Sequence, residues 1–253
     1  MSFSLICVAA SRIRRTRAVA PIFLALLLLA ALPLSSQGIP SAAESKSPDL
    51  DSILQPMEDA QHQNRAQSRP YQVTREYEVF MGSDKQPTSE VMAQIDFVPP
   101  TTETYKITQS KGNSWGEKII RQLLASETES ARKAHGPEVS RAYYDFVFLR
   151  EQDFDGVPEY VLAIFPKRKD KYLLRGQIWV NKNTFRIRQI QGVPAESPSF
   201  WLTDLHITLQ YAEVGGLWVL VAVDGLAKVR FLGQFTLTGI NIPPSASSTP
   251  AAN

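Results

Sequence analysis

Apolar and polar residues alternate with a period of two through most of the chain after residue 70. In YQVTREYEVFM (71–81), one face carries Tyr71, Val73, Tyr77 and Val79, and the other carries Gln72, Thr74, Glu76 and Glu78. The segments 89–98 and 102–108 repeat the pattern. Because successive side chains of a β-strand point to opposite faces, this alternation predicts antiparallel strands with one apolar and one solvated face.

Further segments of the same kind follow, and two helical segments accompany them. The remaining predicted strands are 141–150, 158–166, 171–181, 185–191, 202–212, 216–226 and 229–240. Turn sequences separate several of them, namely DFDG (153–156), NKNT (181–184), VGG (214–216) and DG (224–225). A helix is predicted over 49–68, capped by Asp51 or Ser52, and a second over 114–135, ending at Gly136-Pro137.

These elements predict one domain over residues 44–242 that is mainly β with α (an α+β fold). Its large curved antiparallel sheet would form an incomplete β-barrel, with helices covering the concave face. A helix is about 10 Å wide and strands lie about 4.8 Å apart, so two helices cover roughly half of ten strands. We therefore expect part of the concave face to remain as an apolar concavity, of the kind that binds hydrophobic ligands.

The first 43 residues have the pattern of a secretory signal peptide. Four arginines and no acidic residue precede an uncharged apolar run, AVAPIFLALLLLAALPL (18–34), and small residues follow at Ser41 and Ala43. We expect export to the periplasm and removal of residues 1–43. The alternative is an inner-membrane anchor formed by residues 18–34, which are just long enough to span a bilayer. The Pro/Ser/Ala-rich end, 243–253, is expected to be disordered.

Without residues 1–43 the chain has 23 basic and 25 acidic residues, a net charge of −2. Nucleic-acid binders usually depend on a strong positive field, so no nucleic-acid partner is expected. The single cysteine, Cys7, lies before the apolar run. The exported chain would therefore have no disulfide, thiol nucleophile or cysteine-ligated metal.

No catalytic or metal-binding constellation is evident. His62, His135 and His206 lie on different predicted elements and show no HxH or HExxH spacing, so no metal site and no cofactor are expected. Asp204 and His206 share a strand face and could pair, although a plain solvated face is the simpler interpretation. DFDG resembles the start of a calcium loop, but the ligand series does not continue, which favours a hairpin turn. The basic run PKRKDK (166–171) is interpreted as a solvated loop, with anionic lipid headgroups as the alternative contact.

The order of elements resembles the bacterial outer-membrane lipoprotein-sorting proteins, which have the LolA/LolB-like fold. The stretches that carry this likeness are LDSILQPMEDA before YQVTREYEV, then YVLAIFPK, GQIWVNKNTFRIRQI and LWVLVAVDG. The resemblance implies a half-barrel with a helical lid that binds acyl chains. That family has an arginine beside a proline near the end of its second strand. Here Val98 precedes Pro99, so this arginine is not carried over.

The resemblance and the alternation together give a set of candidate residues. The ligand-binding apolar face would comprise Tyr77, Val79, Ile95, Phe97, Tyr105, Ile107, Phe146, Phe148, Leu205, Ile207, Phe231 and Phe235. The lid would use Ile119, Ile120, Leu123 and Leu124. We expect a periplasmic, non-enzymatic carrier or binding protein whose partners are lipid or lipoprotein acyl chains, with transient membrane contact. The alternative is an envelope protein-interaction or sensor module that uses the same fold without lipid transfer, and an enzyme is the least favoured interpretation.

Overall fold

The structure is a computed structural model that describes residues 48–132, 138–200, 202–230 and 233–242. The expectations for residues 1–43 and 243–253, and for Phe231 and His135, lie outside the described residues. In chain order the elements are α1 (Leu50–Ala66), β1 (Tyr71–Met81), β2 (Ser89–Val98), β3 (Thr102–Gly112), α2 (Ser114–Arg132), β4 (Tyr144–Phe154), β5 (Val157–Pro166), β6 (Leu174–Asn181), β7 (Ile187–Pro194), β8 (Leu202–Val214), β9 (Leu217–Val229) and β10 (Gly233–Ile242).

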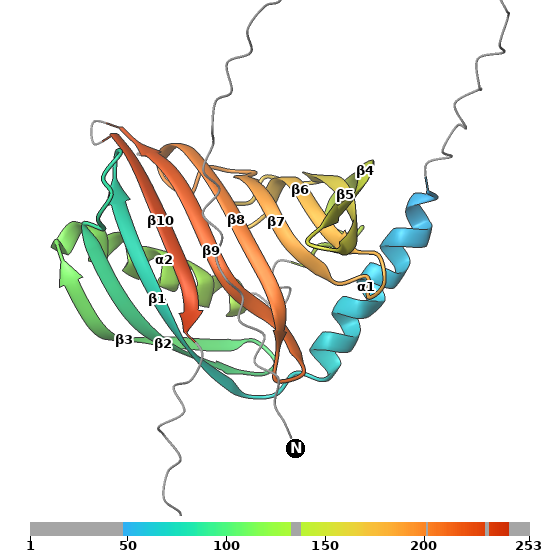
Figure 1. The fold of residues 1–253 in the computed structure, drawn as a ribbon, viewed down its shortest axis with the longest axis horizontal. Coiled ribbons are helices and arrows are strands. Elements are labelled where there is room, and N and C mark those ends of the chain that lie inside the picture. Colours follow the sequence, from blue (N-terminus) through green and yellow to red (C-terminus); the bar gives the residue numbers. More distant parts are fainter. Residues whose placement is uncertain (1–47, 133–137, 201, 231–232, 243–253) are drawn as a thin grey trace, which may run out of the picture. The chain divides into compact units, whose positions relative to one another are not determined.

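The ten strands form one antiparallel sheet in the order β3-β2-β1-β10-β9-β8-β7-β6-β5-β4 (Figure 1). The first and last strands, β1 and β10, pair in the middle, with Tyr77 opposite Gly239. The edges are β3 and β4, and α2 lies between them in the sequence. The sheet is curved and does not close, which confirms the predicted fold class of an incomplete barrel with two helices.

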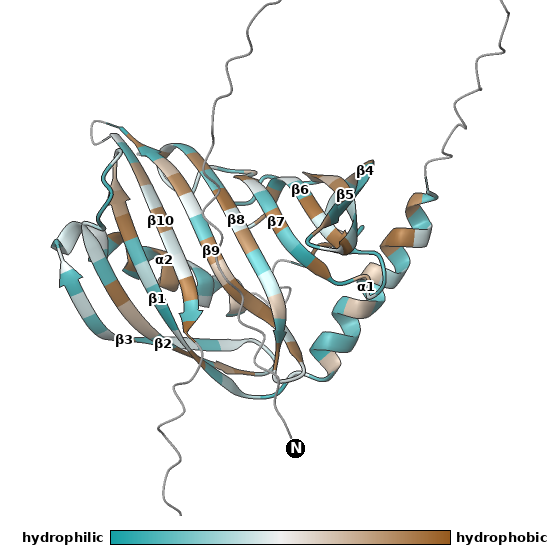
Figure 2. Cartoon of the chain, viewed as in Figure 1, coloured by the Kyte–Doolittle hydropathy of each residue, from teal (hydrophilic) through white to brown (hydrophobic). Residues whose placement is uncertain are grey.

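The predicted alternation of side chains is confirmed along the strands, where apolar and polar residues follow one another (Figure 2). In β2, for example, Val91, Ala93 and Ile95 are buried, and the residues between them are partly exposed. One predicted turn is wrong. Asp224-Gly225 lies inside β9, which continues to Val229, and β10 pairs with it from Gly233. The Asp-Gly pair is typical of a turn, but the residues on both sides of it continue to alternate between apolar and polar, as they do within a single strand.

Two other hairpins show how local chemistry sets the turn. At DFDG, Asp155 and Gly156 both adopt positive φ angles, 53° and 75°, as a two-residue hairpin turn requires. At NKNT, the side-chain oxygen of Asn181 accepts hydrogen bonds from two backbone N–H groups of the turn. Phe185 belongs to this turn, with φ of 54°, so the prediction that the strand begins there is wrong.

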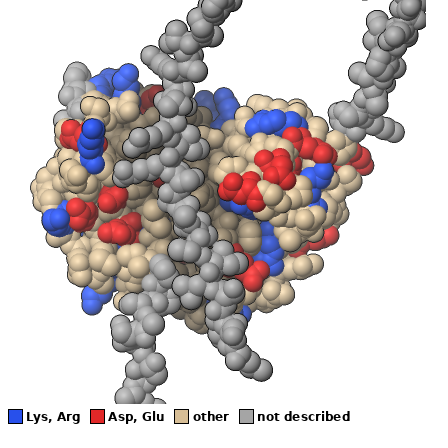
Figure 3. Space-filling view, in the orientation of Figure 1, with Lys and Arg blue, Asp and Glu red and all other residues tan. Residues whose placement is uncertain are grey.

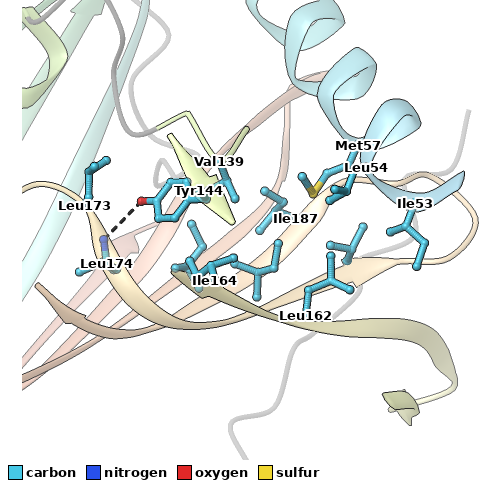
Figure 4. Close-up of a cluster of buried hydrophobic side chains, with 13 residues drawn as sticks. Ile53, Leu54, Met57, Val139, Tyr144, Leu162, Ile164, Leu173, Leu174 and Ile187 are labelled. Atoms are coloured by element: carbon cyan, nitrogen blue, oxygen red, sulfur yellow. Dashed lines mark hydrogen bonds between the residues drawn. The ribbon is translucent and has the colours of Figure 1, made fainter. Parts of the chain in front are cut away.

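Helix α1 covers the half of the sheet formed by β4 to β7 (Figure 4). Its buried residues Ile53, Leu54 and Met57 point toward Leu162, Ile164 and Ile187. The predicted cap is corrected: the side chain of Asp49, not Asp51 or Ser52, accepts a hydrogen bond at the helix start, from the backbone N–H of Asp51. Pro56 lies inside the helix.

Helix α2 covers the other half of the sheet. Its buried residues Ile120 and Leu124 pack against strands β1, β2, β9 and β10, in a second core cluster that includes Tyr77, Val91, Val223 and Phe235. Two residues of β8, Ile207 and Leu209, contact both core clusters. Both helices therefore lie on the same face of the sheet, on either side of β8.

Charged side chains of both signs are interspersed on the face of the molecule visible in Figure 3. Among the described residues, no helix has the length and apolar character needed to cross a membrane. The run 18–34 lies outside those residues.

Candidate functional site

A cavity of about 720 Å³ lies where the two halves of the core meet. Both helices contribute to its wall, α1 through residues such as Ala60 and Asn64, and α2 through residues such as Leu123 and Ala131. The strands provide the rest, including Ile207 and other residues from the middle of the sheet. The volume falls in the range of about 300–1,000 Å³ that is usual for sites that bind small molecules.

Most of the cavity wall is apolar or aromatic. The side chains of this kind that the sheet provides are Tyr71, Val73, Ile95, Phe97, Tyr144, Leu174, Ile187, Ile190, Ile207, Leu209, Tyr211, Leu217, Trp218, Val219, Leu220 and Val223. They come from strands on both sides of β8, because the curved sheet brings its two halves toward each other around the cavity. Such a wall favours hydrocarbon, since apolar surface removed from water contributes about 25 cal/mol per Å².

A charged cluster centred on Arg75 interrupts this apolar wall. Arg75 of β1 is only 4% exposed. Its Nε donates to Oδ1 of Asn241 at 2.7 Å, and its Nη1 donates to the hydroxyl of Tyr77 at 3.2 Å and to Oε2 of Glu127 at 3.3 Å. Glu127 belongs to α2, so this cluster joins the sheet to the helix. A buried guanidinium requires such partners, because leaving it without them is costly.

A second carboxyl, that of Glu103 on β3, also lines the cavity. Tyr71, Phe97 and Glu103 are neighbours across β1, β2 and β3 in the strand register. Burial raises the pKa of Glu103, and the nearby Arg75 opposes this shift. Burial likewise raises the pKa of Glu127 to about 7, against the attraction of Arg75 and with a further contribution from Glu103. The cluster thus contains two acids whose negative charge is disfavoured and one guanidinium.

Tyrosine hydroxyls add to the polar part of the wall. Burial raises the pKa of Tyr71 and of Tyr144 to about 12, and it raises the pKa of Tyr211 further. These hydroxyls stay neutral at physiological pH. The hydroxyl of Tyr144 already accepts a hydrogen bond from the backbone N–H of Leu174 at 3.3 Å, and a tyrosine hydroxyl can both donate and accept.

The α1 side of the cavity has its own polar contacts. The side-chain amide of Asn64 binds the backbone N–H and C=O of Trp218, which fixes the helix to the start of β9. Arg65 pairs with Glu138 at 3.2 Å. The guanidinium of Arg186 lies 5.4 Å from the centre of the Trp218 ring. The described charges on this side are mainly cationic, whereas those around Arg75 are mainly acidic.

The predicted ligand-binding residues divide between the cavity wall and the packed core. Ile95, Phe97 and Ile207 line the cavity. Tyr77, Val79 and Phe235 are buried in the core beneath α2. The other five described residues of this set are partly buried. Four of them pack against a core cluster, namely Tyr105, Ile107, Phe146 and Phe148, and Leu205 lies on β8.

The four predicted lid residues also differ in position. Ile120 and Leu124 are buried in the core, and Ile119 packs beside them. Leu123 alone among the four lines the cavity. This follows from the helical period, since the face of α2 that is centred on Ile120 and Leu124 points at the sheet and Leu123 lies at its border.

Two other sequence features form ion pairs in the structure. Asp204 and His206 do pair, with 3.1 Å between Oδ1 and Nε2, on a solvated strand face. In the basic run, Lys167 pairs with Asp145, Arg168 with Asp170 and Lys171 with Glu129.

The charged residues of the cavity were missed by the sequence analysis, although the alternation contains a signal for them. Arg75 is two residues from both Val73 and Tyr77, so its side chain lies on the same, inward face of β1. Glu103 likewise shares its face with Tyr105. A charged residue at an inward position of an amphipathic strand is the observation that would have identified this cluster.

No protein-family model matches this sequence, and neither does the sequence of any curated protein. Several solved structures match the chain at low sequence identity and with TM-scores below 0.5. One is a domain from Vibrio parahaemolyticus described as an outer membrane lipoprotein-sorting protein domain, with 12% identity, a TM-score of 0.42, and coverage of 74% of this chain and 90% of that one.

Two further structures are similar to a comparable extent. A LolA superfamily protein from Nitrosomonas europaea has 14% identity, a TM-score of 0.35, and coverage of 75% of this chain and 90% of that one. A DUF1329 family protein from Desulfovibrio piger has 12% identity, a TM-score of 0.36, and coverage of 77% and 95%. The described residues themselves show the expected fold class, an open antiparallel sheet of ten strands with two helices on one face.

Proposed function

We propose that this protein is an exported, periplasmic carrier or binding protein that holds the acyl chains of a lipid or lipidated protein in the cavity between α1 and α2. The observation that carries the proposal is the apolar cavity of about 720 Å³ that remains between two well-packed halves of the core. Export is supported by the composition of residues 1–43.

Binding in such a cavity requires no covalent chemistry. Each buried methylene of a chain contributes about 0.8 kcal/mol. Affinity then depends on how much hydrocarbon the wall can cover, less the cost of ordering the chain and the side chains around it. A ligand would enter the cavity past the helices, because both helices form part of the cavity wall and the strands form its base.

The test is to purify the chain without residues 1–43 and to measure its binding of N-phenyl-1-naphthylamine, a neutral probe that fluoresces in apolar surroundings. Native mass spectrometry would show whether lipid co-purifies. The cavity-filling variant Leu123→Trp should weaken probe binding at least fivefold. Gln122→Trp, at the adjacent, exposed position of α2 outside the cavity wall, is the matched control and should bind as the wild type does.

Failure of the wild type to bind any apolar probe or lipid would overturn the proposal. A stable complex with another envelope protein, formed by such a non-binding chain, would favour the protein-interaction module instead.

A further inference from the structure

The polar cluster at the cavity wall bears on which amphiphile the cavity accepts. We infer that the cavity selects amphiphiles whose polar group carries no negative charge, such as an alcohol, an ester or an amine, over carboxylates and phosphates with the same chain. The inference rests on the proposed function and adds the chemistry of the headgroup to it. The residues that would set the selection are Arg75, Glu103 and Glu127.

The only guanidinium of this cluster already has its partners within the protein. Nε of Arg75 is bound to Asn241 at 2.7 Å, and Nη1 is shared between Tyr77 at 3.2 Å and Glu127 at 3.3 Å. With the residue 4% exposed, little of the guanidinium is open to a ligand. An incoming anion would have to displace Glu127 in order to pair with it.

The two carboxyls make the surroundings of Arg75 unfavourable for an anion. Glu103 and Glu127 both line the cavity and already share one positive charge. A ligand carboxylate placed beside them would be a third acid in a poorly solvated site, where like charges repel more strongly than they do in water. A cationic or neutral group meets no such repulsion, and it can use the carboxyl oxygens as hydrogen-bond acceptors.

Of the other three lysine and arginine side chains described in the cavity wall, two form ion pairs. Arg65 has Glu138 at 3.2 Å, and Lys171 has Glu129 at 3.6 Å. Arg186 lies over the ring of Trp218, and its buried Nη1 has no hydrogen-bond partner among the described residues, so it has no acidic partner of its own. An anionic headgroup bound at Arg186 is the arrangement that would contradict the inference, so the experiment includes a variant at this position.

The experiment compares three ligands with the same twelve-carbon chain in displacing N-phenyl-1-naphthylamine at pH 8: laurate, 1-monolaurin and dodecylamine, each below the concentration at which it aggregates. Monolaurin and dodecylamine should displace the probe at concentrations at least tenfold lower than laurate. In Glu127→Gln and in Glu103→Gln this ratio should fall below threefold. Glu117→Gln, on the outward side of α2 where Glu117 pairs with Arg121, is the matched control and should keep the ratio.

The outcomes separate the inference from the proposed function. If the wild type binds the probe but laurate displaces it as well as or better than the other two ligands, the inference is overturned and the carrier proposal stands. A loss of laurate binding in Arg186→Gln, with laurate preferred in the wild type, would assign the headgroup to Arg186 instead. If the probe does not bind at all, the proposed function itself fails. Should Glu127→Gln not fold, Glu103→Gln alone decides, because Glu103 forms no hydrogen bond or ion pair with α2 in the described part of the chain.

Discussion

The guanidinium of Arg75 on β1 lies 3.3 Å from the carboxylate of Glu127 on α2, across 52 residues of sequence. The pair spans from the middle of the sheet to the helix that covers it, at the wall of an otherwise apolar cavity. The other partners of Arg75, Tyr77 and Asn241, come from β1 and β10, the first and last of the described strands, which pair with each other. Docking of α2, formation of the sheet and the polarity of the cavity are thus linked through one side chain.

We predict that Arg75→Met destabilises the protein by about 3 kcal/mol at pH 8, measured as the free energy of unfolding in urea. The reason is that removing one member of a buried pair leaves the other buried and uncompensated. The double variant Arg75→Met/Glu127→Gln should recover at least half of the loss. Arg121→Met, which breaks the exposed pair with Glu117 on the same helix, should cost no more than about 0.5 kcal/mol. If the double variant lost as much stability as Arg75→Met, the uncompensated charge of Glu127 could not be the cause of the loss.

The pH dependence of stability should report on Glu127. Its pKa is raised from 4.5 to about 7, chiefly by burial. Between these pH values the folded chain binds a proton that the unfolded chain releases, so stability falls as the pH rises from about 4.5 to about 7 and then levels off. The contribution is at most about 3 kcal/mol, because one pKa unit corresponds to about 1.4 kcal/mol.

The measurement is the free energy of unfolding from pH 5 to pH 8 for the wild type and for Glu127→Gln. The difference between the two should change in favour of the variant as the pH rises. Since all other titrating groups are shared, a difference that stays constant with pH would rule out a raised pKa at this site.

Helix α1 should depend on Arg141 in a comparable way. Arg141 donates to Glu58 at 2.8 Å and to Asp51 at 3.0 Å, and its backbone N–H also donates to Glu58. We expect Arg141→Met to lower stability by about 1–2 kcal/mol, because charge-assisted hydrogen bonds to a largely buried carboxylate are lost.

The loss should be local. Amide hydrogen exchange should accelerate in α1 and remain unchanged in α2. Burial raises the pKa of Glu58 but the hydrogen bonds from Arg141 outweigh it and leave that pKa lowered. The contribution of the pair is therefore present above pH 4.5 and is lost as the pH falls below it. Lys111→Met, which breaks an exposed pair with Glu90, should affect neither stability nor exchange in α1.

The sequence predicts the fold more completely than it predicts the site. The alternation identifies the ten strands and the faces of residues such as Val91 and Ile95, because burial of one sheet face is a local, repeated constraint. The turn at Asp224-Gly225 was predicted wrongly because turn propensity is weak against the pairing of a long strand with two neighbours. The Arg75 cluster depends on contacts between residues far apart in the chain, which no local pattern specifies.

The last prediction concerns a glycine in the part of the sheet that α2 covers, where the backbone lies close to a buried ring. Gly239 on β10 lies opposite Tyr77 of β1, and a Cβ at this position would lie 2.7 Å from the Tyr77 ring and 2.7 Å from Val223. Because Tyr77 is fully buried and bound to Arg75, its ring has little room to move. Gly239→Ala should therefore cost about 1–3 kcal/mol through overpacking. Gly225→Ala on the neighbouring strand β9 is the matched control, since its Cβ would meet only Leu237 at 3.9 Å. Gly225→Ala should be neutral or slightly stabilising in the same urea titration. If both glycine variants lost equal stability, the limited space beside Tyr77 would not be the reason for the effect of Gly239→Ala.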